Sequence, residues 1–137
     1  MGYLFLLGYI LLVGVATFLQ KFAMKTLSPF QLEFLVAIGM ISISSAALFF
    51  NQKSFNMPVS GIPMGILVGL LFSGGSLAFT LGLSKMNVGL ASAISVSYVV
   101  LALILSVIFL KEPLNLMKTI GITLTLVGVA ILFYQPS

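Results

Sequence analysis

Charged side chains divide this chain into uncharged hydrophobic segments, each about as long as a lipid bilayer is thick. Segments 1–20, 34–52, 54–84, 86–110 and 119–137 contain no charged side chain. A helix of about 20 apolar residues, rising about 1.5 Å per residue, crosses a hydrocarbon core of about 30 Å. The pattern therefore predicts five transmembrane helices. The charges that separate them are Lys21, Lys25, Glu33, Lys53, Lys85, Lys111, Glu112 and Lys118.

Local signals place the ends of these helices. Ser28, with Pro29 after it and Gln31 three residues on, matches a capping box that opens a helix. Glu33 is expected in the first turn of that helix, where an acid complements the positive helix end. Pro113 ends the fourth helix and Asn115 caps the fifth. The expected helices are 2–24, 29–50, 63–83, 88–111 and 116–134, with a loop at 51–61.

Composition supports this fold class and excludes several others. The chain is 61% hydrophobic and 6% charged, whereas soluble domains carry about 25% charged residues. The segments are continuously apolar and do not alternate, which disfavours a β-barrel. The net charge of +4 comes from scattered lysines, which does not favour nucleic acid as a partner. We expect an all-α integral membrane bundle of one domain, with the lipid bilayer around it.

Catalytic and cofactor-binding patterns are missing from the sequence. The chain contains no cysteine and no histidine, and its two glutamates lie at expected helix boundaries. We therefore expect no enzymatic activity, no metal site and no cofactor. Because no carboxylate or histidine is expected near mid-membrane, we also expect no obligatory proton relay through a buried side chain.

The lysines are distributed evenly between the two expected sides of the membrane. Five helices place Lys53, Lys111 and Lys118 on one side and Lys21, Lys25 and Lys85 on the other. Lysine counts beside helix ends normally set orientation, so a balanced count specifies insertion only weakly. This pattern is compatible with dual topology and an antiparallel homodimer. There are two alternatives. Lys21 lies too deep in the membrane to influence orientation, with its hydrocarbon stem along apolar surface and its ammonium at the interface, or a longer native sequence sets the orientation.

Two glycines seven residues apart in the fifth helix form a candidate dimer seam. Gly121 and Gly128 are almost two turns apart and so lie on one stripe of the helix. In lipid, such small residues let two backbones come close, and packing drives the association. The alternative is that the same stripe packs inside the bundle.

Hydroxyl-bearing residues in the third and fourth helices are the candidates for a substrate cavity. Ser95 and Tyr98 are expected near mid-membrane, where a tyrosine hydroxyl needs a partner across the bundle or on a bound substrate. In the third helix, Gly65 and Gly69 precede hydroxyl residues on roughly the same face, so the stripe either lines a wet cavity or packs closely. The other candidates are Ser73, Ser76, Thr80, Thr17, Gln20 and Ser42.

Two stretches of the sequence resemble a known family of transporters. The first runs from Gln20 to Pro29; the second runs from Ala91 through Phe109-Leu110-Lys111-Glu112-Pro113-Leu114 to Gly128-Val129-Ala130. Together they make the chain similar to a single EamA-type domain of the drug/metabolite transporter superfamily. The chain also resembles the related small multidrug resistance proteins in its glycine seam. However, Val13 stands where those proteins have their essential glutamate, and no arginine occurs in this chain.

The resemblance implies half of an inverted-repeat transporter. Such transporters move small organic metabolites through a cavity between two five-helix units, so it implies an antiparallel homodimer or a similar partner chain. Together with the neutral hydroxyls, it leads us to expect alternating-access transport of an amino-acid-like, neutral or zwitterionic solute across the plasma or inner membrane. The alternatives are a lipid-linked sugar flippase subunit and a non-transporting assembly or regulatory subunit.

Overall fold

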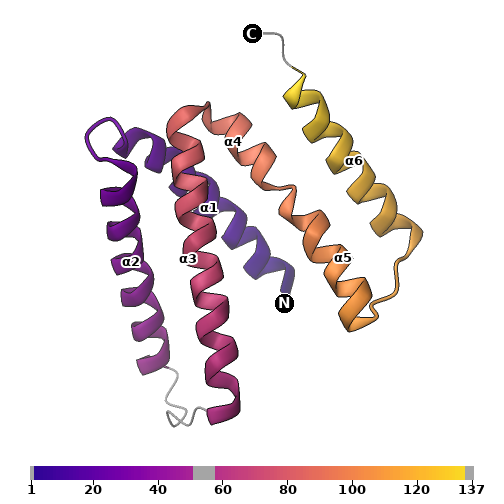
Figure 1. Ribbon diagram of the computed structural model, residues 1–137, viewed down its shortest axis with the longest axis horizontal. Coiled ribbons are helices and arrows are strands. Elements are labelled where there is room, and N and C mark those ends of the chain that lie inside the picture. Colours follow the sequence, from indigo (N-terminus) through magenta and orange to yellow (C-terminus); the bar gives the residue numbers. More distant parts are fainter. Residues whose placement is uncertain (1, 51–57, 135–137) are drawn as a thin grey trace. The chain divides into compact units, whose positions relative to one another are not determined.

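The computed structural model describes residues 2–50 and 58–134, and within them the chain is all-α, as predicted. Within these residues, five helical spans are long and apolar enough to cross a membrane. Figure 1 shows the helices that form them. The chain divides into two compact units, with the boundary in the sequence between Lys85 and Met86, and each is described by itself. The elements are α1 Gly2–Ala23, α2 Pro29–Phe50, the 3₁₀ turn η1 Val59–Gly61, α3 Ile62–Lys85, α4 Val88–Ser95, α5 Tyr98–Leu110 and α6 Leu116–Phe133.

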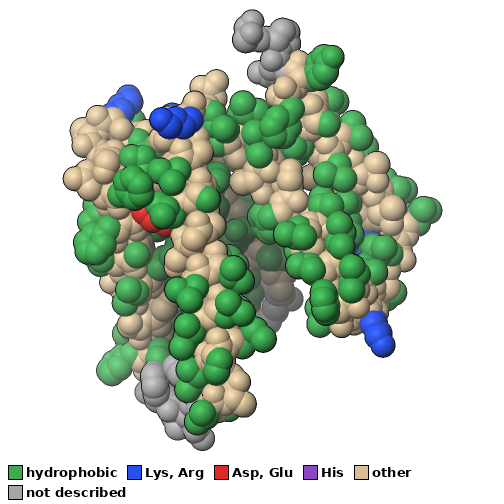
Figure 2. Space-filling view, in the orientation of Figure 1, with side chains coloured by type: hydrophobic (Ala, Val, Ile, Leu, Met, Phe, Trp, Pro, Cys, Tyr) green, Lys and Arg blue, Asp and Glu red, His purple; other side chains and the backbone are tan. Residues whose placement is uncertain are grey.

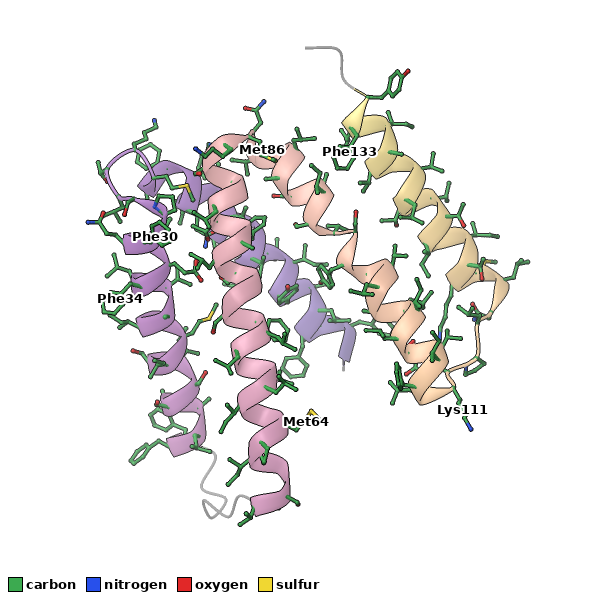
Figure 3. All side chains as sticks on the ribbon, viewed as in Figure 1. Phe30, Phe34, Met64, Met86, Lys111 and Phe133 are labelled. Carbon is green, nitrogen blue, oxygen red and sulfur yellow. The ribbon has the colours of Figure 1, made fainter. Side chains whose placement is uncertain are left out.

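The first unit contains α1, α2 and α3, and α3 packs against both of the others. The predicted capping box at the start of α2 is confirmed. The Ser28 N–H donates to Gln31 Oε1 at 2.9 Å, and the Gln31 N–H donates to Ser28 Oγ at 3.3 Å. Farther along α2, Phe30 and Phe34 are 64% and 67% exposed and point away from α3 (Figure 3). This outer face of α2 is suited to lipid.

The second unit contains α4, α5 and α6. Asn115 caps α6 as predicted, because its Oδ1 accepts the Lys118 N–H at 2.8 Å. The single helix predicted over 88–111 is divided in the structure: α4 ends at Ser95 and α5 begins at Tyr98. The two halves still form one hydrophobic span, Val88–Leu110, of transmembrane length.

Most side chains of both units are exposed, although most are apolar. Among the described residues, the buried ones are Leu32, Thr80, Leu83 and Ala91. In a soluble protein, so much exposed apolar surface would cause aggregation. In a bilayer, lipid chains or a partner helix cover it. Figure 2 shows this apolar surface, with acidic colour only in a small area between α2 and α3.

The end of α5 contains a strained residue. Lys111 has φ 53° and ψ 33°, which is the left-handed region that favours glycine. The Lys111 N–H bonds to the Ser106 carbonyl, and the Glu112 N–H points to the same oxygen at 3.4 Å. The left-handed residue thus turns the chain back over the last turn of α5, before Pro113.

We expect Lys111→Gly to stabilise the protein. Glycine removes the left-handed strain at position 111 but adds freedom to the unfolded chain, so the net gain is about 0.5–1 kcal/mol. The free energy of unfolding in detergent measures it. Lys118→Gly is a matched control because Lys118 lies in the first turn of α6, where glycine should instead cost up to about 1 kcal/mol. Equal destabilisation by both substitutions would contradict the assignment of strain to Lys111.

Candidate functional site

Charged side chains of the first unit make two polar contacts with the last turns of α3. Lys21, near the end of α1, donates from Nζ to the Leu83 carbonyl at 2.6 Å. Thr80 donates from Oγ1 to Glu33 Oε2 of α2 at 2.9 Å. Thr80 and Leu83 are fully buried and lie one turn apart on α3. We call these four residues, Lys21, Glu33, Thr80 and Leu83, the polar junction.

The polar junction corrects the expectation for Glu33 and gives Lys21 a specific partner. Glu33 does not lie in the first turn of α2, and its carboxylate accepts a hydrogen bond from α3 instead of complementing the end of its own helix. The Lys21 ammonium binds the Leu83 carbonyl, one of the last four carbonyls of α3, which have no partner within the helix. A lysine there also complements the negative end of α3. The Lys21 side chain therefore connects α1 to α3, and the Glu33 side chain connects α2 to α3.

The second polar feature is the break between α4 and α5. The Ser97 N–H bonds to the Ile94 carbonyl and the Val99 N–H to the Val96 carbonyl, both at 3.0 Å. These are i to i−3 bonds, so the helix tightens into 3₁₀ geometry across the break. In a regular α-helix, the Ser97 N–H would instead bond to the Ala93 carbonyl and the Val99 N–H to the Ser95 carbonyl.

The two strongest cavity candidates lie on either side of this break. Ser95 is the last residue of α4, is half-buried, and donates from Oγ to the Ser92 carbonyl at 2.8 Å. Tyr98 is the first residue of α5 and is 61% exposed. The break thus brings a serine hydroxyl and an accessible aromatic ring to one level of an otherwise apolar span.

The remaining candidates are spread over α1, α2 and α3. Thr17 donates to the Val13 carbonyl and Ser42 to the Ile38 carbonyl, both at 2.8 Å, which is the local bonding expected of hydroxyls within a helix. Gln20 and Ser76 are half-buried, and Ser73 is exposed. Thr80 belongs to the polar junction.

The glycine seam lies on open surface. Gly121 and Gly128 are both exposed, and a Cβ atom added at either would meet no atom within 4 Å. The same holds for Gly65 and Gly69 in α3. Within its own unit, neither glycine pair is packed closely against a described residue. The nearby Thr125 hydroxyl bonds to the Gly121 carbonyl at 2.9 Å, so the stripe presents little unsatisfied polarity.

Sequence reasoning missed the position of the break and the partners of the two charges. One signal for the break was present, because Ser92, Ser95 and Ser97 fall within six residues of the most apolar span. Serine competes with the backbone for hydrogen bonds and weakens a helix interior. No local signal pointed to the partners of Lys21 and Glu33.

Comparison with known families supplies the identity that the geometry alone does not give. The model of the EamA-like transporter family matches residues 1–134. Comparisons with curated proteins and with solved structures gave no match. The match covers all five candidate membrane spans, so the family assignment and the observed helices agree. The chain belongs to the EamA-like transporter family and is a multi-pass membrane transporter of small molecules.

Proposed function

We propose that the protein moves a small, amino-acid-like metabolite, neutral or zwitterionic, across the plasma or inner membrane by alternating access. The observation that carries this proposal is the broken span α4–α5, with Ser95 and Tyr98 at the break. The helix continues in 3₁₀ geometry through the break, and a 3₁₀ stretch in the middle of a helix often marks a functional hinge. Discontinuous helices near mid-membrane form the substrate sites of many secondary transporters.

Charge favours a neutral or zwitterionic solute. Between Met86 and Leu110 the chain has no charged residue, so a site at the break offers dipoles and an aromatic ring but no ion. A strong cation in a membrane cavity normally needs a carboxylate partner. A solute with one apolar part and a few polar groups matches the usual lining of a small-molecule site.

A second five-helix unit completes the proposed transporter. Alternating access in transporters with inverted repeats requires two units of opposite orientation around one site. The exposed stripe with Gly121 and Gly128 is the contact that we assign to the second unit. The balanced lysines support an antiparallel copy of this chain produced by dual topology; a similar partner chain is the other possible second unit.

Uptake by purified protein in liposomes tests the proposed function. The solutes are a labelled panel of amino acids, and uptake into protein-free liposomes is the baseline. We expect at least one panel member to enter faster than this baseline. Uptake of the whole panel at the baseline rate would favour a non-transporting subunit or a lipid-linked sugar flippase.

We expect Tyr98→Ala to reduce uptake about tenfold or more while the protein still inserts and folds. The ring is 61% exposed, so its loss leaves no cavity in the core of its unit, whereas a bound solute would lose an aromatic contact. Tyr98→Phe retains the ring and separates its contribution from that of the hydroxyl. Wild-type uptake by Tyr98→Ala at normal expression would remove Tyr98 from the site.

We also expect transport without an obligatory proton relay through a side chain. Glu33 is held by Thr80, and Glu33→Gln keeps an oxygen that accepts the same hydrogen bond. Uptake by the double variant Glu33→Gln, Glu112→Gln should therefore persist, without stoichiometric proton counterflow in a pH-dye assay. Counterflow that survives in this variant would require another proton carrier and would contradict the expectation.

A further inference from the structure

The charged side chains described in the first unit all lie at one end of it. Lys21 is in the last turn of α1, Glu33 is near the start of α2, and Lys85 is the last residue of α3. Lys25 follows α1 by two residues. The polar junction holds the three helices together at this end, and Figure 2 shows lysine side chains gathered there. With three lysines and one glutamate, this end has a net charge of +2.

Two of these charges are engaged inside the unit, and two are exposed. Lys21 and Glu33 belong to the polar junction, whereas Lys25 and Lys85 are exposed. Glu33 is the sole acidic residue in the sequence from 1 to 85, and its carboxylate accepts a hydrogen bond from Thr80. The two exposed lysines therefore present positive charge to the surroundings of the unit.

The exposed lysines lie at a similar level, slightly beyond the polar junction. The Lys25 N–H bonds to the Phe22 carbonyl at 3.2 Å, so the helical turn continues past the end of α1. Lys25 therefore lies about 6 Å beyond Lys21 along the helix axis, and Lys85 lies about 3 Å beyond Leu83. Both positions follow the end of an apolar span, which is where hydrocarbon gives way to lipid headgroups.

The Phe22 ring supports the Lys25 ammonium group and adds apolar surface beside it. Lys25 Nζ lies 4.6 Å from the centre of the ring, which is a cation–π contact. The ring itself is 61% exposed. A positive charge above an exposed aromatic ring matches the two parts of a phospholipid, because a headgroup phosphate pairs with the ammonium and an acyl chain covers the ring.

We propose that this end of the first unit binds an anionic phospholipid, with its headgroup at Lys25 and Lys85 and an acyl chain against Phe22. Clustered lysines at the membrane surface attract anionic headgroups. A zwitterionic lipid has the same phosphate but also a cationic group that the lysines repel, so the site selects net negative charge. Each lysine favours the anionic lipid by a factor of about five, and the two together by about thirtyfold.

The chain contains no tryptophan, so Phe22→Trp introduces a single fluorescent reporter at the proposed site. Tryptophan also retains the cation–π contact with Lys25. The full chain is reconstituted in bilayers of phosphatidylglycerol and phosphatidylcholine, and each lipid in turn carries bromine in the upper part of its acyl chains. Bromine quenches a tryptophan that it contacts, so the two quenching curves give the relative affinity of the two lipids. Both leaflets have the same composition, which makes the result independent of protein orientation.

We expect phosphatidylglycerol to bind beside the reporter about thirtyfold more tightly than phosphatidylcholine. Lys25→Gln together with Lys85→Gln should bring the two affinities close to equal, whereas Lys25→Arg together with Lys85→Arg should retain the preference. Lys111→Gln together with Lys118→Gln is the matched control, because it removes the same charge from the second unit and should leave the preference unchanged. Circular dichroism checks that each variant keeps its helices.

Three results would overturn the proposal. The first is equal quenching by the two brominated lipids when all lysines are present. The second is a preference that persists in the glutamine pair at 25 and 85. The third is an equal loss of preference in the control pair at 111 and 118, because the net charge of the whole chain would then attract the lipid and no local site would be needed.

Discussion

Leucine at both Gly121 and Gly128 is expected to dissociate the proposed dimer into monomers in a bilayer. Both glycines lie on open surface of α6, where nothing in the described part of the chain lies within 4 Å of an added Cβ. Leucine therefore fits the isolated unit without a clash. Between two copies, however, it holds the backbones apart and removes the close packing on which association in lipid depends.

The expected effect on association is large. Overpacking a close contact costs about 1–3 kcal/mol per position, so two positions weaken the dimer by roughly thirtyfold or more. Single-molecule photobleaching in liposomes counts the copies per assembly, and circular dichroism checks that the helices persist. Leucine at Gly65 and Gly69 is the matched control, because these glycines have equally open surroundings on α3. The assignment of the dimer contact to α6 is wrong if leucines at Gly65 and Gly69 dissociate the dimer and leucines at Gly121 and Gly128 do not.

Loss of the Lys21 ammonium is expected to destabilise the first unit by about 2 kcal/mol. In Lys21→Met the carbonyl of the fully buried Leu83 loses a charge-assisted hydrogen bond of 2.6 Å. An unsatisfied buried acceptor costs about 1–3 kcal/mol. Methionine retains most of the apolar stem, so the change isolates the ammonium.

Lys25→Met provides the control for this measurement. Lys25 is exposed, and its Nζ lies 4.6 Å from the centre of the Phe22 ring, a contact of about 0.5–1 kcal/mol. We expect unfolding in detergent to show a clearly smaller loss for this variant. If the two substitutions cost the same, the polar junction does not hold α1 to α3.

Features decided by neighbouring residues were predictable from the sequence. The capping box of Ser28 and Gln31 and the Asn115 cap depend on residues three apart, and both formed as expected. The partners of Lys21 and Glu33 were not predictable, because Leu83 and Thr80 lie 62 and 47 residues away. Their contacts depend on how three helices pack, which one sequence does not reveal.

The candidate site was predictable in its residue types but not in its backbone. Ser95 and Tyr98 stood out because polar groups are rare in an apolar span. The break between them depends on a small difference in free energy between i to i−4 and i to i−3 hydrogen bonds. The span is otherwise apolar enough to continue as one helix.

Counterflow in proteoliposomes tests the central claim, transport by alternating access, most directly. Vesicles are preloaded with the unlabelled amino acid that gives the fastest uptake and are diluted into a trace of the same compound in labelled form. We predict transient accumulation of label above its equilibrium level, because each carrier that returns with internal solute is ready to bind label outside. Tyr98→Ala should lose this overshoot. Labelled uptake that rises only to equilibrium, at a rate independent of the internal solute, would contradict the account.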